Sequence, residues 1–436
     1  MTSGTGSSKA AAANAAAVPP LFASRWTSPP EFARELPPAT LPKGFRAAGV
    51  AAGIKRSGKT DFGLVVSDGE HTASAARFTV SSAPAAPVQV CRTRVDLAAI
   101  RAVIVNSGNA NAATGPTGRD NAFYMQGAGA MAAGLPESQV AVASTGVIGQ
   151  QLDTSVLSLG ASKVVRELRS DGGLDFATAI MTTDLWPKLG ALSVELTGGT
   201  VTLSAQGKGA GMMAPMHGPA QLHATLLCFV ETDARLDAAT ADRLLGGAVA
   251  KSFDRVTVDG QLSTNDSVFL LAGGESGVEV TTGSDDEQRL QQALDALLLG
   301  MAISLVRDGE GADRVGRVTV NGGDAMLCER AARAVADSPL VKTALNGGDP
   351  NWGRIMQAVG MALATGRPEP IDITIEGIRV ASDGVANRFD EAALNAAVSG
   401  REVEYEVKIP GAGASATVYF SDLGHDYVTL NAEYTT

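Results

Sequence analysis

Short apolar runs that alternate with helical segments along almost the whole chain are the feature that most restricts its fold. Runs rich in β-branched residues predict strands at residues 101–107, 139–145, 192–204, 225–231, 267–272, 314–320, 371–380, 402–409 and 415–421. Helical periodicity and capping residues predict helices at 121–134, 154–169, 237–251, 285–305, 325–336 and 389–398. This interleaving predicts an α/β fold, built as a layered mixed sandwich with a smaller C-terminal α/β portion.

Residues 1–42 differ from the rest of the chain. They are rich in Ala, Ser, Thr and Pro and show no repeating apolar face, so we expect a flexible leader. The absence of acidic residues before Glu31 resembles an organelle transit peptide, but the arginine density is low and no apolar signal core is present. We therefore expect a cytoplasmic protein, with organelle targeting by the leader left open. No run approaches the roughly 20 apolar residues of a membrane span.

Composition narrows the class of ligand. The net charge of −11 argues against nucleic acid and against anionic membrane surfaces, both of which need a basic face. The three cysteines have no CxxC spacing and the four histidines form no helical pair, so neither a disulfide framework nor a metal site is predicted. Lys208 lies in Gly-Lys-Gly, which lacks the spacing of a phosphate-binding loop. We expect small polar substrates and no cofactor.

The dipeptide Ala224-Thr225 separates a glycine-rich segment, 207–215, from the apolar run 225–230. If the peptide bond between the two residues is cut, Thr225 carries both a hydroxyl and a free α-amine, which is a nucleophile with its own base. A threonine before an apolar run is also typical of an ordinary strand, because β-branched side chains suit a pleated surface. The neighbouring motifs decide between the two interpretations.

Several polar clusters follow predicted strands or occupy predicted turns. Strand ends are natural sites for ligand chemistry, although each cluster alone is also typical of a turn or a helix cap. The clusters are Asn106-Ser107-Gly108-Asn109-Ala110-Asn111, Ser144-Thr145-Gly146-Val147-Ile148-Gly149, Met181-Thr182-Thr183-Asp184, Asp308-Gly309-Glu310-Gly311 and Asp349-Pro350-Asn351-Trp352-Gly353-Arg354.

Together and in this order, the clusters resemble the ornithine acetyltransferase family, whose members are also called glutamate N-acetyltransferases. The resemblance runs from Lys43-Gly44-Phe45-Arg46 to the C-terminal Glu433-Tyr434-Thr435-Thr436. It implies the layered sandwich of that family and a precursor that cleaves itself between Ala224 and Thr225. The products would be an α chain, 43–224 after the leader, and a β chain, 225–436, which stay associated and assemble into a higher oligomer of αβ units.

The resemblance also implies a reaction in arginine biosynthesis. N-acetylornithine donates its acetyl group to Thr225, and glutamate then removes it, which gives ornithine and N-acetylglutamate by a ping-pong route. The hydroxyl of Thr145 and the backbone N–H of Gly146 would form the oxyanion hole. The substrate-binding residues carried over by matching motifs are Thr182, Lys208, Thr225, Glu310, Asn431 and Thr436. A lysine suits a carboxylate and a glutamate suits an ammonium group, so Lys208 and Glu310 are expected to recognise charge.

Three departures from the family pattern leave questions open. Residues 216–224 contain an insertion of about six residues directly before the predicted cleavage point, where His223 is a further candidate base. Gln261 and Leu262 stand where Asp and Thr are usual, and Arg314 stands where Lys is usual. The sequence leaves open whether the insertion permits cleavage, whether the replacements alter the substrate, and whether acetyl-CoA is a second donor.

Three alternatives therefore stand beside the transferase. In an N-terminal-threonine amidohydrolase or peptidase, water discharges the acylated Thr225 instead of glutamate. A paralogue in specialised metabolism would use another acyl acceptor, and a catalytically inactive relative would serve in binding or assembly. Acceptor assays distinguish the hydrolase from the transferase, and an acetyl adduct on Thr225 excludes the inactive relative.

Overall fold

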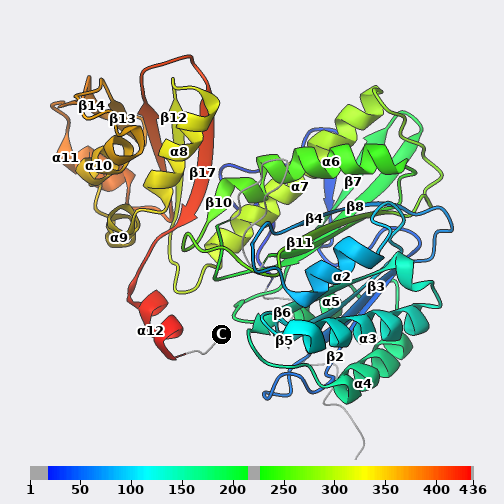
Figure 1. Cartoon of the computed structure of the whole chain (residues 1–436). Helices are drawn as coiled ribbons and strands as arrows, with labels where there is room; N and C mark the ends of the chain where they lie inside the picture. The colour runs from blue at the N-terminus through cyan, green and yellow to red at the C-terminus, as the bar shows by residue number, and fades with distance from the viewer. Residues whose placement is uncertain (1–17, 215–225, 434–436) are drawn as a thin grey trace, which may run out of the picture. The chain divides into compact units, whose positions relative to one another are not determined.

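The computed structural model describes residues 18–214 and 226–433, which belong to two compact units. The first unit comprises Met1–Lys208, Leu226–Val249 and Thr264–Met301, and the second comprises Gly209–Thr225, Ala250–Ser263 and Ala302–Thr436. Each contains both helices and sheet (Figure 1). The predicted mixed α/β class, with an α/β portion at the C-terminus, is confirmed.

Two sheets form the first unit. The six-stranded sheet has the order β1 (Ala33–Leu36), β7 (Lys188–Leu196), β8 (Gly199–Lys208), β9 (Leu227–Thr232), β11 (Ser267–Ala272) and β4 (Ala73–Phe78). The four-stranded sheet has the order β2 (Phe45–Val50), β3 (Phe62–Ser67), β5 (Ala102–Asn109) and β6 (Val140–Val147). Only the β9–β11 and β5–β6 pairs are parallel among these neighbours.

Helices cover the outer faces of both sheets, which gives the unit four layers (Figure 1). Alongside the six-stranded sheet lie α6 (Ala238–Lys251) and α7 (Asp285–Arg307), and Arg77 of β4 donates to Asp242 of α6 at 2.6 Å. Beyond the four-stranded sheet lie α3 (Gly115–Ala133) and α4 (Thr154–Val164). The remaining helices are α2 (Ala86–Arg94), α5 (Gly173–Ala179) and the 3-10 turns η1 (Glu137–Gln139) and η2 (Val165–Glu167).

Aromatic packing joins α5 to the six-stranded sheet. The ring of Phe176 in α5 meets that of Phe229 in β9 edge-on, with centroids 5.0 Å apart, and Phe229 stacks on Phe269 of β11 at 5.7 Å. All three side chains are fully buried. Burying a side chain of this size contributes about 1.5–3 kcal/mol, so this contact stabilises the packing of α5 against the six-stranded sheet.

The second unit is built on one seven-stranded sheet. Its order is β10 (Val256–Thr257), β17 (Ser415–Ser421), β12 (Val315–Asn321), β16 (Glu402–Lys408), β13 (Asp372–Ile375), β14 (Ile378–Ser382) and β15 (Val385–Ala386). The helices are η3 (Phe253–Arg255), α8 (Ala325–Ala336), α9 (Pro339–Gly347), α10 (Trp352–Leu363), α11 (Glu391–Ala397) and α12 (His425–Glu433). Apolar side chains of α8 and α10 form one core with those of the sheet.

Two predicted strands are wrong, because each is a hairpin. Residues 192–204 fall in β7 and β8, which reverse over two residues between Leu196 and Gly199. Residues 371–380 fall in β13 and β14, which reverse at Glu376 and Gly377 with φ of 47° and 77°. Two successive positive φ angles give the twist that a tight hairpin requires, and the Glu-Gly pair was not recognised as such a turn.

The predicted flexible leader, 1–42, is wrong for its second half. Residues 1–17 lie outside the described residues, but β1 pairs with β7 in antiparallel register and Leu21 is buried. Composition did not reveal β1, because Ala33–Leu36 shows no alternating apolar pattern.

Two helix starts follow the sequence signals. Ser284 accepts the N–H of Glu287 at 3.1 Å, and Asp237 accepts the N–H of Thr240 at 2.7 Å. Helix α7 is the one helix in the described ranges that is long and apolar enough to cross a membrane. Since 61% of its most apolar window is buried inside the protein, it has the position of a core helix.

Candidate active site

Thr145 and Lys208 meet at the ends of two strands. Their side chains are buried, with 0% and 2% of each residue exposed, and Lys208 Nζ donates to Thr145 Oγ1 at 3.2 Å. An ammonium group can only donate, so the Thr145 hydroxyl oxygen accepts this bond. The hydroxyl hydrogen of Thr145 remains available to donate to another group. The positive charge also polarises that O–H bond. This pair is suited to stabilising a developing negative charge.

The alternation of side chains along β8 brings Lys208 to this position. Lys208 lies opposite Leu227 in the ladder with β9, and Leu227 shares a strand face with Phe229. Phe229 packs against Phe176 in the core between the sheets. Lys208 therefore extends toward the four-stranded sheet, in which Thr145 ends its buried run.

Gly146 requires the absence of a side chain. Its φ is 130°, which residues with a Cβ rarely adopt, and a Cβ built there would lie 2.4 Å from the carbonyl carbon of Gly108. Gly108 is the register partner of Gly146 in the parallel ladder of β5 and β6. The backbone at the predicted oxyanion hole thus depends on two facing glycines.

Asp184 links the predicted residue Thr182 to Lys208. Its Oδ1 accepts from Lys188 Nζ at 2.6 Å, and its Oδ2 accepts the N–H of Thr182 at 2.9 Å and lies 3.9 Å from Lys208 Nζ. Burial acts to raise the pKa of Asp184, but the two ammonium groups and these hydrogen bonds outweigh it and hold the pKa well below its ordinary value. The sequence offers Asp184 only as part of a turn motif and does not single out Lys188, four residues later, as its partner.

Lys55 is a further cation beside these groups. Its side chain lies over Gly108, and its Nζ donates to the carbonyl of Thr60 at 2.7 Å. Burial, with a smaller contribution from the charge of Lys208, lowers the pKa of Lys55 to about 8, against the opposing charges of Asp61 and Asp184. The sequence signal was weak, since Lys55 lies in a loop between two strands that were not predicted.

Glu310 and Asn431, two other predicted substrate-binding residues, meet in the second unit. Asn431 Nδ2 donates to Glu310 Oε2 at 2.9 Å, and the N–H of Glu310 donates to the carbonyl of Ala210 at 2.8 Å. A Cβ at Gly211 would lie 2.4 Å from Glu310 Oε2. The glycine-rich segment therefore passes directly over this carboxylate, and a larger residue at Gly211 would displace the Glu310 side chain.

Asp259, which the sequence did not single out, holds the same glycine-rich segment. Its carboxylate accepts the N–H groups of Met212 at 2.6 Å and Met213 at 2.8 Å. Burial raises the pKa of Asp259 and the charge of Glu310 adds to the rise, against the hydrogen bonds that lower it. Carboxylate-to-amide bonds of this kind fix a backbone more firmly than neutral ones do.

The three unusual residues differ in their surroundings. The N–H of Gln261 donates to Asp259 Oδ1 at 3.1 Å, and Leu262 is 42% exposed. Arg314 Nη1 donates at 2.9 Å to the carbonyl of Val398, the residue that ends α11. Arg314 therefore has a structural partner in the second unit.

The predicted cleavage site and one end of the chain lie outside the described residues. This applies to Ala224, Thr225, Thr436 and the insertion with its histidine. The described chain resumes at Leu226, whose N–H donates to Asp266 Oδ1 at 2.7 Å. The structure thus brings Thr145, Lys208 and Thr182 into one network, and Glu310 and Asn431 into another, in separate compact units.

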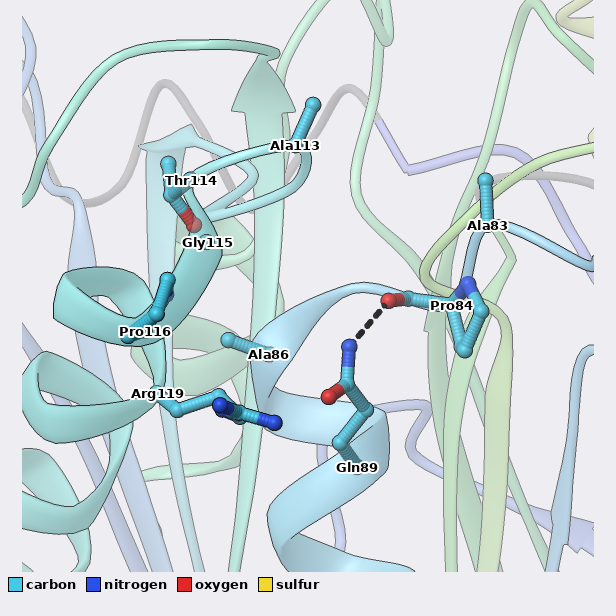
Figure 2. A pocket seen from close by; sticks show the side chains of 9 residues that line it. All are labelled: Ala83, Pro84, Ala86, Gln89, Ala113, Thr114, Gly115, Pro116 and Arg119. Atoms are coloured by element: carbon cyan, nitrogen blue, oxygen red, sulfur yellow. Dashed lines mark hydrogen bonds between the residues drawn. The ribbon is translucent and has the colours of Figure 1, made fainter.

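A cavity of about 290 Å³ opens beside the starts of α2 and α3 (Figure 2). Gln89 of α2 and Arg119 of α3 line it, and Gln89 Nε2 donates to the carbonyl of Pro84 at 2.7 Å. Asn111 lies just before the lining residues 113–116, and its φ of 47° is typical of an asparagine in a turn. None of the predicted site residues lines this cavity.

Comparison with known proteins gave consistent matches. The model of the ArgJ family matches residues 46–436. The arginine biosynthesis bifunctional protein ArgJ of Nitratidesulfovibrio vulgaris is 41% identical over 90% of this chain and 98% of its own length, and that of Symbiobacterium thermophilum is 40% identical over 91% and 98%. A crystal structure of ornithine acetyltransferase complexed with ornithine, from Mycobacterium tuberculosis, is 42% identical over 42% of this chain and 98% of that chain, with a TM-score of 0.40.

Proposed function

Because this chain belongs to the ArgJ family, we propose that it transfers the acetyl group of N-acetylornithine to glutamate, giving ornithine and N-acetylglutamate in arginine biosynthesis. The observation that carries this proposal is the buried bond from Lys208 to Thr145. It supplies a polarised hydroxyl beside a fixed positive charge, which is what an acyl transfer needs where the carbonyl oxygen becomes an anion.

Maturation comes first. Thr225 Oγ attacks the carbonyl carbon of Ala224, the C–N bond breaks, and the nitrogen takes up the proton that the hydroxyl loses. Water then opens the resulting ester, which leaves a carboxylate on Ala224 and a free α-amine on Thr225. The two products are residues 1–224 and 225–436.

Acetyl transfer uses the same nucleophile. The α-amine of Thr225 accepts the hydroxyl proton as Oγ attacks the acetyl carbonyl, and ornithine leaves with that proton on its amine. The amine of glutamate then attacks the acetyl-threonine ester and restores the hydroxyl. In each step the hydroxyl of Thr145 and the N–H of Gly146 donate to the oxyanion, and one such donor is typically worth about 10²–10³ in rate.

Charge selects the substrates. The ammonium of Lys208 suits a substrate carboxylate, and the Glu310 carboxylate, held by Asn431, suits the ammonium of ornithine. Thr182 and Thr436 complete the proposed set of binding residues.

The strand ladder supports lasting association of the two chains. β8 ends at Lys208, before the cleavage point, and β9 begins at Leu227, after it, yet six residues of each pair in antiparallel register. β9 also pairs with β11 on its other side. A cut between Ala224 and Thr225 leaves these ladders intact, so the two chains remain parts of one sheet.

Intact-mass analysis tests cleavage and chemistry together. Purified protein should give two masses that meet at Ala224-Thr225, and N-acetylornithine should add one acetyl group to the chain that begins with Thr225. Glutamate should then remove this group and yield N-acetylglutamate. The Thr225→Ala variant should remain one full-length chain and accept no acetyl group.

Each alternative outcome has a distinct meaning. A full-length wild-type chain would refute self-cleavage. Free acetate as the only product at saturating glutamate would identify a hydrolase, and no adduct at all would identify a catalytically inactive relative. Incubation with acetyl-CoA in place of N-acetylornithine decides whether it is a second donor.

A further inference from the structure

Two adjacent buried residues, Asn265 and Asp266, bind backbone groups in both sheets of the first unit. Asp266 Oδ1 accepts the N–H of Leu226 at 2.7 Å. Asn265 Nδ2 donates to the carbonyl of Ser144 at 2.8 Å and to that of Ala110 at 2.7 Å. Asn265 is 2% exposed and Asp266 is fully buried, so these bonds are formed away from solvent.

The bonded backbone groups lie next to the proposed oxyanion donor and next to the proposed nucleophile. Ser144 directly precedes Thr145 in β6, and Leu226 directly follows the proposed nucleophile and directly precedes β9. β6 belongs to the four-stranded sheet and β9 to the six-stranded sheet. Successive residues of one chain segment therefore fix one backbone point in each sheet.

The anchoring on the β6 side is itself rigid. Ser144 Oγ donates to Asn106 Oδ1 at 2.6 Å, and Asn106 Nδ2 donates to the carbonyl of Asn109 at 2.8 Å. The ends of β5 and β6 are thus held together by side chains in addition to their ladder. Any shift of Asn265 would move this whole end of the sheet relative to β9.

We propose that Asn265 and Asp266 are positioning residues that set the separation between the oxyanion donor Thr145 and the backbone that carries the nucleophile. They act through Ser144 and Leu226. The proposal rests on the proposed function, because it assigns these residues to the same acyl transfer. Misplacing reacting groups by about 1 Å costs roughly 10²-fold in rate, whereas substrate affinity depends on other contacts.

The two positions differ in what they require. Asp266 supplies an acceptor for an N–H, and asparagine in its place keeps an oxygen acceptor. Asn265 supplies N–H donors to two carbonyls, and aspartate in its place would set an anion against both of them. The conservative exchange should therefore be tolerated at Asp266 and not at Asn265.

The experiment compares full-length wild type with Asn265→Ala, Asn265→Asp, Asp266→Ala and Asp266→Asn. Asp286→Ala is the control for the loss of a bond from a carboxylate to a backbone N–H. Asp286 accepts the N–H of Thr197 at 2.8 Å in the turn between β7 and β8. Steady-state rates with N-acetylornithine and glutamate, thermal melting and the fraction of cleaved chain are measured for each protein.

We expect kcat to fall about 10²-fold in Asp266→Ala and in both Asn265 variants, with KM for N-acetylornithine little changed. Asp266→Asn and Asp286→Ala should keep kcat near that of wild type. Equal losses in Asp266→Ala and Asp266→Asn at unchanged melting temperature would overturn the proposal, as would full activity of the alanine variants. A wild-type protein without acetyl-transfer activity would refute the proposed function instead. In that case the fraction of cleaved chain in the same variants tests the positioning role.

Discussion

Replacing Glu231 with glutamine should remove a pH-dependent loss of stability from the first unit. Glu231 lies in β9 and is fully buried, and its Oε2 accepts from Ser204 Oγ at 2.7 Å and from Gln206 Nε2 at 3.1 Å. Among the described residues, Glu231 Oε1 and Gln206 Oε1 have no hydrogen-bond partner. Both atoms are acceptors that lack a donor, and a protonated Glu231 would bring one donor to this buried group.

The direction of the pH effect follows from the pKa of Glu231. Burial raises this pKa from 4.5 to about 7, against the hydrogen bonds from Ser204 and Gln206 that lower it. Between these two pH values the folded protein keeps a proton that the unfolded chain has lost. Stability therefore falls as pH rises through this window, and the total loss is about 3 kcal/mol, since one pKa unit corresponds to about 1.4 kcal/mol.

Urea denaturation followed by far-UV circular dichroism, at about pH 5 and about pH 8.5, measures this loss. The Thr225→Ala background keeps the chain in one piece, so unfolding does not depend on association. Glutamine reproduces the protonated acid at all pH values, so Glu231→Gln should reduce the difference in unfolding free energy between the two pH values by about 3 kcal/mol.

The control for this experiment is Glu195→Gln, because Glu195 is an exposed glutamate of β7 in the same sheet. It should leave the pH dependence unchanged. A reduction of less than about 1 kcal/mol in Glu231→Gln would refute the reasoning, because it would mean that Glu231 is ionised in the folded protein at neutral pH.

Three further predictions concern the site. Thr145→Val removes a proposed oxyanion donor and should lower kcat about 10²–10³-fold in the acetyl-transfer assay, and an unchanged kcat would exclude that role. Asp184→Asn leaves the buried ammonium groups of Lys188 and Lys208 without their counter-charge and should destabilise the protein by about 3–5 kcal/mol in urea denaturation; a loss below about 1 kcal/mol would contradict the burial argument. Gly146→Ala places a Cβ against backbone at an unfavourable φ, so both melting temperature and activity should fall, and wild-type values for both would disprove the steric constraint.

Local sequence signals predicted the elements that local physics determines. The strands 267–272 and 415–421 and the helix 325–336 match β11, β17 and α8 at both ends. Each combines a clear apolar pattern with a polar or acidic boundary residue. The two merged hairpins failed because a two-residue turn interrupts an apolar pattern too briefly to be seen.

The site depends on contacts between residues far apart in sequence, which hydrophobic periodicity cannot predict. Lys208 and Thr145 are 63 residues apart in sequence and belong to different sheets, so their contact results from packing around Phe229. The family resemblance predicted both residues, but it did not predict that they bind each other. The spacing of four residues between Asp184 and Lys188 is typical of an ion pair within a helix. These two residues do form an ion pair, but at the start of a strand.

The central position of β9 determines the order of events during biogenesis. Because β9 lies between β8 and β11, a separate fragment 1–224 would expose the unpaired edge of β8, and a separate fragment 225–436 would lack β8 altogether. Open edges of this kind invite aggregation. If the chain is cut at the proposed site, it should therefore complete its sheet as one polypeptide first, and the two fragments produced separately should assemble poorly, however well each is synthesised.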